Sequence, residues 1–226
     1  MSTQALLAQY DVGKDPAALQ SKYQKMRQDA FAFFRGSVHL FYDNLPKGAA
    51  IGAPLAWVCG DAHAENFGSY MARNGLVYFD CNDFDHACLA PCSLDILRLA
   101  SSLIIACHAH KQDGDAITQH AISAYRQALL EGKSNWVERA ACHGLVEELL
   151  KTTKKRTHKD WLHERALKSP NGQLCINTDH KGISPASQAQ IDKINILWAL
   201  HAPQDWQLQD IACRQAGLAS RGLERY

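Results

Sequence analysis

The chain has 226 residues, 46% of them hydrophobic, which is enough for one large domain or two small ones with a sizeable core. The formal net charge of +1 at pH 7 gives no indication of a nucleic acid or another polyanion as partner. The longest apolar run, residues 99–107, is far too short to span a bilayer, so we expect no membrane segment. The eight cysteines form no CxxC pair and residues 1–14 contain no signal peptide, which together predict reduced thiols and a cytoplasmic location.

The first predicted element is a helix. Asp15 followed by Pro16 is typical of a helix N-terminus, and apolar residues keep helical spacing as far as the Phe-Phe-Arg-Gly segment at 33–36. Arg35 ends this segment as a cation. It could bind a phosphate of a nucleotide, or form an ion pair with a carboxylate of the protein.

The centre of the sequence is a loop, residues 60–68 (GDAHAENFG), followed by a second acidic run, residues 79–85 (FDCNDFD). A second helix is predicted at 38–42, and a buried strand at 55–59 leads into the loop. Between the loop and the acidic run, Asn74-Gly75 separates two short β-type runs. Asn-Gly is a strong hairpin signal, because both positions of a type I′ turn need positive φ.

The register of this hairpin decides which acidic residues meet. A two-residue loop pairs Asn66 with Asp83 and Ser69 with Asp80. Carboxylates and an amide oxygen at the open end of a hairpin make an oxygen-rich site for a hard cation such as Mg²⁺ or Mn²⁺. We predict Asn66 and Asp80 as metal ligands, with Asp83 as the replacement for Asp80 if the register differs.

The spacing within the loop indicates a reaction. An Asp followed after four residues by an Asn is the catalytic-loop pattern of protein kinases, in which the Asp orients the substrate hydroxyl and the Asn holds metal. Asp61 and Asn66 have this spacing, and Asp80 follows at the end of the next strand, where kinases place a metal-binding Asp. The catalytic residue is therefore predicted to be Asp61, with His63 as an orienting residue of the same loop.

At these residues the chain resembles the kinase-like phosphotransferases, particularly the aminoglycoside and choline kinase branch, although Cys59 stands where that branch has His. The chain is more closely similar to a bacterial family, domain of unknown function 2252. That similarity is carried by residues 31–36 (FAFFRG), 59–68, 79–85, Arg156-Thr157 and 214–217. The kinase resemblance implies Mg²⁺ with ATP or a similar nucleotide, and a small-molecule or protein acceptor. It also implies that Asp95 supports the catalytic loop rather than binding metal.

After the acidic run the sequence is mainly helical, and Ser93 is predicted to cap a long apolar helix over 94–110. Amphipathic spacing predicts a helical scaffold, with a turn and one short strand. Its helices are expected at 116–130, 136–152, 156–166 and 187–200, the turn at 169–172 and the strand at 174–176. The fold class is therefore α+β and predominantly helical, resembling the helical catalytic lobe of a kinase-like fold with a β-hairpin that carries the acidic site.

Charge is unevenly distributed along this sequence. Residues 61–95 contain six acids and one base, net −5, whereas residues 151–168 contain seven bases and two acids, net +5. An acidic site facing a basic stretch would suit a metal–phosphate ligand. A solvated basic helix face is the alternative explanation.

Residues 214–226 resemble the place where the family has a glycine-rich turn that leads into a strand. The resemblance implies that Gly217 and Gly222 bind nucleotide, in a nucleotide lobe displaced to the C-terminal side of the catalytic loop. Ala219 stands at the middle glycine of that turn, which makes close backbone approach to a phosphate less easy. The chain stops at Tyr226, where the strand with a phosphate-binding Lys is expected, and this predicts a truncated or degenerate form.

We expect one kinase-like domain over residues 1–226, incomplete at its C-terminal end. Its core is placed at 14–110, its helical scaffold at 111–213 and the start of the glycine-rich turn at 214–226. The predicted function is that of a Mg²⁺-dependent phosphotransferase, and a non-catalytic kinase-like binding module or fragment is the alternative. A metal-dependent phosphoesterase is a weaker alternative: Gly-Asp-x-His resembles the calcineurin-like hydrolases, but the Gly-Asn-His motif of those enzymes does not occur.

Overall fold

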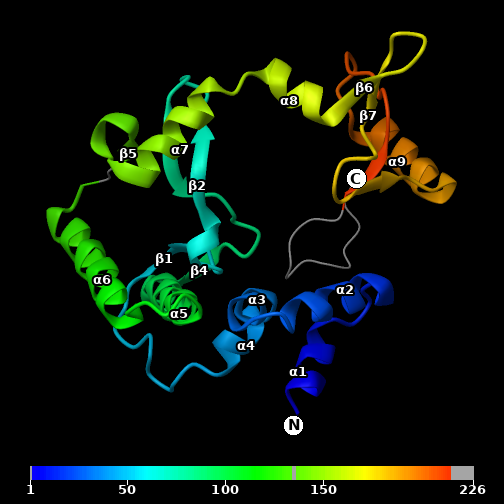
Figure 1. Ribbon diagram of the computed structural model, residues 1–226. Helices are drawn as coiled ribbons and strands as arrows, with labels where there is room; N and C mark the ends of the chain where they lie inside the picture. Colours follow the sequence, from blue (N-terminus) through cyan, green and yellow to red (C-terminus); the bar gives the residue numbers. More distant parts are fainter. Residues whose placement is uncertain (1, 134–135, 215–226) are drawn as a thin grey trace. The chain divides into compact units, whose positions relative to one another are not determined.

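The computed structural model describes residues 2–133 and 136–214 (Figure 1). The chain divides into two compact units. The first unit comprises residues 1–13 and 20–155, and the second comprises residues 14–19 and 156–226. Helices predominate, and the strands of the described residues form four small antiparallel sheets. The α+β, predominantly helical class is therefore confirmed.

The N-terminal helices are α1 (Thr3–Tyr10), α2 (Pro16–Met26), α3 (Ala30–Gly36) and α4 (Val38–Asp43). Asp15 caps α2 as predicted, because its Oδ2 accepts a hydrogen bond from the Ala18 N–H at 2.7 Å. The helical spacing that continues to residue 36 is interrupted at 27–29. There Asp29 starts a new helix by accepting a hydrogen bond from the Ala32 N–H, also at 2.7 Å.

Strand β1 (Leu55–Val58) pairs with β4 (Cys88–Pro91) in a two-stranded sheet. The strand predicted at 55–59 is confirmed over Leu55–Val58, but it is not buried as predicted, since Leu55 is 66% and Trp57 is 80% exposed. Strand β4 is not among the elements that the sequence predicts. Trp57 lies opposite Leu89, so both exposed side chains share one face of this small sheet.

Strands β2 (Phe67–Met71) and β3 (Val77–Cys81) form the predicted hairpin, but its loop has three residues rather than two. The Ala72 N–H donates to the Leu76 carbonyl, and the Gly75 N–H donates back to the Ala72 carbonyl, each at 2.9 Å. Gly75 has φ of +76°, whereas Asn74 is not among the residues with positive φ. A type I′ turn needs positive φ at both positions, so the loop is instead a turn closed by one left-handed glycine.

The longer loop shifts the register by one residue. Asp80 lies opposite Gly68, and the backbone N–H of Asn82 donates to the carbonyl of Asn66 at 2.8 Å. The predicted pairings of Asn66 with Asp83 and of Ser69 with Asp80 are therefore wrong. A one-residue shift in register moves every side chain of a strand to the other face. As a result Asn82, and not Asp83, lies opposite Asn66.

Helix α5 (Ser93–Ala109) packs against α3 and α6 (Gly114–Glu131). Its extent agrees with the prediction, except that Ser93 begins the helix and Cys92 occupies the N-cap position. The predicted helix over 136–152 is wrong in its first half. That part forms the short strand β5 (Val137–Glu138), which pairs with β3, and a 3₁₀ turn η2 (Arg139–Ala141), and the helix α7 (Gly144–Lys155) then packs on β2 and β3 (Figure 1).

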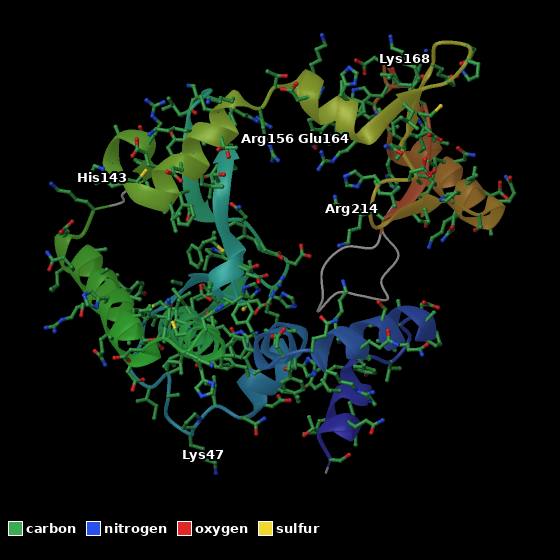
Figure 2. All side chains as sticks on the ribbon, viewed as in Figure 1. Lys47, His143, Arg156, Glu164, Lys168 and Arg214 are labelled. Carbon is green, nitrogen blue, oxygen red and sulfur yellow. The ribbon has the colours of Figure 1, made fainter. Side chains whose placement is uncertain are left out.

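The second unit contains α8 (His158–Arg165), β6 (Ala166–Lys168), β7 (Leu174–Ile176), β8 (Ile183–Pro185), α9 (Gln188–His201) and β9 (Ala212–Arg214). The predicted strand at 174–176 and the predicted helix from Ser187 are confirmed. A capping box starts α8, because the Thr157 side chain accepts from the Asp160 N–H and the Asp160 side chain accepts from the Thr157 N–H. Arg156, Glu164 and Lys168 mark the course of α8 and β6 in Figure 2.

The first unit has a partly polar core. Met26, Val58 and Leu150 are among its buried apolar residues, yet Arg98 and Ser102 of α5 are fully buried with them. Buried polar groups normally need internal partners. Within residues 2–133 and 136–214, no helix has both the length and the apolar character needed to cross a membrane.

Candidate functional site

The loop predicted to carry the chemistry begins at Gly60, directly after β1. Gly60 has φ of +79°, and a Cβ at this position would lie 2.2 Å from the carbonyl oxygen of His86. Only glycine combines this backbone conformation with such a close approach. The Gly60 carbonyl accepts a hydrogen bond from the Tyr42 hydroxyl at 2.6 Å, so the start of the loop is fixed from two directions.

Helix α5 holds the loop backbone. The Asp95 carboxylate accepts hydrogen bonds from the N–H groups of Cys59 at 2.8 Å and Gly60 at 3.1 Å. Two turns further along, the Ser102 hydroxyl accepts a hydrogen bond from the Ala64 N–H at 3.1 Å. Asp95 thus supports the loop through its backbone N–H groups.

Asp61 is held through its side chain by Arg98. The Arg98 Nε and Nη2 donate to the same Asp61 oxygen, Oδ1, at 2.9 and 2.7 Å. Nη2 also donates to the Phe34 carbonyl at 2.9 Å, and the guanidinium lies 3.6 Å from the centroid of the Phe34 ring. The Arg98 side chain is 0% and the Asp61 side chain 11% exposed, so this is a buried ion pair.

The second oxygen of Asp61 faces His63. His63 Nε2 lies 3.9 Å from Asp61 Oδ2, and only 2% of His63 is exposed. Burial lowers the pKa of His63 below 6.5, and the attraction of the Asp61 carboxylate opposes this effect without reversing it. His63 Nδ1 is buried without a hydrogen-bond partner, so the imidazole is held by burial more than by hydrogen bonds.

Asn66 joins the loop to the hairpin. Its side-chain Nδ2 donates to the Asp61 carbonyl at 2.8 Å, and its own carbonyl accepts the bond from Asn82 described above. Asn66 is 7% exposed. With the nitrogen of the amide engaged, its oxygen is the atom that could act as a metal ligand.

Asp80 is exposed near the end of β3, opposite Gly68. Its Oδ1 accepts a hydrogen bond from the next backbone N–H, that of Cys81, at 2.8 Å. Asn82 lies two residues further, on the same side of the ribbon, and a Cβ on Gly68 would lie 2.5 Å from Asn82 Nδ2. Asp80 and Asn82 therefore lie on the same face of the hairpin as Gly68.

Asp83 lies beyond the last strand pair, and its Oδ1 accepts a hydrogen bond from the Asp85 N–H at 3.1 Å. The described residues contain no group of three or more His, Cys, Asp or Glu side chains that could hold a metal ion. Magnesium is commonly bound by one or two carboxylates together with substrate phosphates. Asn66 and Asp80 together offer one amide oxygen and one carboxylate, which could hold such an ion only in combination with other ligands.

Of the residues predicted to bind a cofactor, Arg35 is described and two are not. Arg35 Nη1 forms an ion pair with the Glu65 carboxylate beside the loop, while its Nε is buried without a hydrogen-bond partner. The structure thus favours the ion-pair alternative for Arg35. Gly217 and Gly222 lie outside the described residues.

Two cysteines flank the site. Cys59 precedes Gly60 and Cys81 follows Asp80. The interaction between the two thiols raises the pKa of Cys59 and lowers the pKa of Cys81 to about 7, although burial acts against the lowering at Cys81.

Residues 14–226 match a protein family described as "Uncharacterized protein conserved in bacteria (DUF2252)". The chain belongs to this family. No curated protein and no solved structure matches this DUF2252 chain.

Sequence reasoning missed two residues of the DUF2252 site, Arg98 and Ser102. With Asp95 they are spaced three and four residues apart, which places them on one face of α5. Three polar residues at this spacing in an otherwise apolar helix are the signal that could have found them. They contact the loop at successive points, from residue 59 to residue 64.

Proposed function

We propose that this chain is a kinase-like phosphotransferase module, which transfers a phosphoryl group from ATP or a similar nucleotide to a hydroxyl of an acceptor. The observation that best supports this proposal is that hydrogen bonds fix the backbone of the loop from Asp61 to Asn66. The Asp95 carboxylate binds the backbone at the start of this loop, and the Asn66 side chain closes it on the Asp61 carbonyl. Phosphoryl transfer depends mainly on positioning and charge stabilisation, so a rigid loop of this kind serves it.

In this proposal Asp61 orients the acceptor hydroxyl and accepts its proton. Arg98 engages Oδ1, so the oxygen available for this role is Oδ2, on the side of His63. His63, uncharged near neutral pH because its pKa is lowered, limits the directions from which an acceptor can approach Oδ2.

The Asn66 oxygen and the Asp80 carboxylate are the proposed ligands for Mg²⁺ or Mn²⁺, with Asp83 as the weaker candidate because its carboxylate closes a local turn. A magnesium ion supplies neutralisation of the charge that develops on the transferred phosphoryl group. Asp80 is exposed and so could share such an ion with nucleotide phosphates.

A second candidate function is a binding module without catalysis. It is favoured by the burial of the Asp61 side chain, which is 11% exposed and has one oxygen occupied by Arg98. A catalytic base must reach the proton that it abstracts. In this alternative the same loop binds a nucleotide without turning it over.

Thermal unfolding of the purified chain tests the nucleotide–metal site. The chain is melted alone, with Mg²⁺, and with Mg²⁺ plus ATP, beside Asp80→Asn and the control Asp85→Asn. A ligand at a hundred times its Kd stabilises the folded state by about 2.7 kcal/mol. The proposal expects a shift with Mg·ATP that Asp80→Asn removes and Asp85→Asn keeps, and it fails if wild type and Asp80→Asn respond alike.

Formation of ADP then separates the two functions. For a phosphotransferase, we expect slow transfer to water or to added hydroxyl compounds. Asp61→Asn combined with Arg98→Met, which leaves no unpaired charge in the core, should abolish this transfer while the Mg·ATP melting shift remains. Nucleotide binding without any turnover in the wild-type chain would favour the binding module. Hydrolysis of simple phosphate esters without nucleotide would point instead to a phosphoesterase.

A further inference from the structure

A cavity of about 650 Å³ lies in the first unit, among α1, α3, α4 and α5. Helix α3 contacts both α4 and α5, and α4 contacts α1 (Figure 1). Most of the cavity wall is apolar and comes from Ala30, Phe33, Phe34, Leu40, Phe41 and Ile105. Cavities of this volume, apolar with a few polar groups, are typical of sites that bind small molecules.

Arg98 supplies the charged group of this wall. A guanidinium has five N–H bonds, and three of those of Arg98 are engaged by Asp61 and by the Phe34 carbonyl. Nη1 carries the other two. It is buried, and no atom of residues 2–133 or 136–214 accepts a hydrogen bond from it. Because the guanidinium is planar and rigid, Nη1 is turned away from the edge that binds Asp61, and Arg98 keeps an unused donor at the wall of the cavity.

Two other polar side chains of the wall are already engaged. Ser37 Oγ donates to the Phe33 carbonyl at 2.6 Å, and Asn44 Nδ2 donates to the Leu40 carbonyl at 2.8 Å. A buried donor without an acceptor costs free energy, which an oxygen atom of a ligand restores. Arg98 Nη1 is therefore the group of the wall that best fixes a ligand.

We propose that this cavity binds a neutral, largely apolar molecule with one carbonyl oxygen, which accepts a hydrogen bond from Arg98 Nη1. The ligand is neutral because Asp61 already balances the charge of Arg98, and an added anion would leave an unpaired charge among apolar groups. The rings of Phe34 and Phe41 lie edge to face at 5.9 Å beside the guanidinium, an arrangement that an aromatic ring of the ligand can extend.

Nη1 is covered by protein atoms, so a ligand oxygen reaches it only when a side chain moves. Phe41 is the side chain placed to do so, because it is partly exposed and its ring centroid lies 4.9 Å from the guanidinium. The inference goes beyond phosphoryl transfer and does not depend on it, since it concerns the cavity and not the loop.

Titration of the full chain with three small probes, followed by NMR, tests this inference. Acetophenone carries an aromatic ring and a carbonyl, ethylbenzene has nearly the same shape without the oxygen, and phenylacetate carries an anion. We expect acetophenone to bind at least about ten times more tightly than ethylbenzene, the ratio that one hydrogen bond to a charged donor gives, and also more tightly than phenylacetate. The chemical-shift changes should include the Arg98 guanidinium and concentrate on residues 30–44 and 98–105.

Variants make the result specific. Ala30 lines the cavity and is exposed, so Ala30→Phe should fill part of the cavity and weaken the binding of acetophenone. Ala116→Phe, at an exposed position in the first turn of α6, is the matched control and should leave this binding unchanged. The double variant Arg98→Met with Asp61→Asn removes the donor together with its partner, and it should bind acetophenone and ethylbenzene alike.

The inference is overturned if the wild-type chain binds acetophenone and ethylbenzene with equal affinity, or if Ala30→Phe leaves the affinity for acetophenone unchanged. Unchanged chemical shifts at residues 30–44 and 98–105 at millimolar acetophenone also overturn it. Tighter binding of phenylacetate than of acetophenone would contradict the neutral class of ligand. The comparison of the three probes uses the wild-type chain, so it decides the role of Arg98 even if the double variant does not fold.

Discussion

Arg98 carries a charge in the core of the first unit, where its guanidinium donates two hydrogen bonds to Asp61 and one to the Phe34 carbonyl. Removing one partner of a buried ion pair leaves the other charge unpaired and costs about 3–5 kcal/mol. Arg98→Met should lower the free energy of unfolding by this amount, as measured by urea denaturation. The double variant Arg98→Met with Asp61→Asn should regain part of the loss, because no unpaired charge then stays buried. A loss below about 1 kcal/mol for the single variant, a size typical of an exposed pair, would contradict this view of the pair.

Protonation of His63 should make the free energy of unfolding depend on pH. Its pKa in the folded chain lies below the 6.5 of the unfolded chain, so between these two values the unfolded state holds more protons. The free energy of unfolding should therefore rise with pH through this window and lose its dependence on His63 above it. Because the chain has eleven His residues, the measurement is the difference between wild type and His63→Gln at each pH. A difference that is constant from pH 5 to pH 7.5 would show that His63 does not titrate as burial requires.

At the scale of elements, one face of α5 determines the conformation of the loop. Asp95 satisfies two backbone N–H groups with one carboxylate, whereas an Asn offers a single oxygen and places an amide N–H group against a donor. Hydrogen bonds to a charged group contribute about 1.5–3 kcal/mol. Asp95→Asn should cost about this much and speed hydrogen exchange at the amides of Cys59 and Gly60. Asp115→Asn, in the first turn of α6 and exposed, is the matched control and should change neither.

The hairpin shows what the sequence could and could not predict about the site. Asn74-Gly75 correctly located the turn, but two kinds of short loop compete at such a sequence, and they differ by one residue in length. The choice depends on whether Asn74 takes positive φ, which the local sequence does not decide. Asp80 consequently lies opposite Gly68 instead of Ser69, and Asp83 falls outside the strand pairing.

Long-range contacts account for the other differences from the sequence-based predictions. Capping residues and periodicity correctly placed the start of α2, and also α6 and α9, because those signals are local. Strand β4 was missed because residues 88–91 become a strand only through pairing with β1. Arg98 was missed because no local sequence pattern predicts an ion pair with a residue 37 positions away.

At the scale of the whole molecule, the residues of the candidate site belong to a single compact unit. Asp61, Asn66, Asp80 and the supporting face of α5 all fall within residues 20–155, while α8, α9 and their small sheets belong to the second unit. Cooperative unfolding usually follows such contiguous units. We therefore expect the two units to lose their structure at different denaturant concentrations.

Two variants, one in each unit, test this expectation. Asp95→Asn should shift only the unfolding of residues 20–155. Thr157→Ala, which removes the N-cap of α8, should lower the stability of the second unit alone, by about 1 kcal/mol. Hydrogen exchange, measured for each peptide at a series of urea concentrations, reports the unfolding of both units in one experiment. If each variant shifted every peptide of the chain equally, the two units would form one cooperative structure, and a ligand bound at the loop would then stabilise the second unit as strongly as the first.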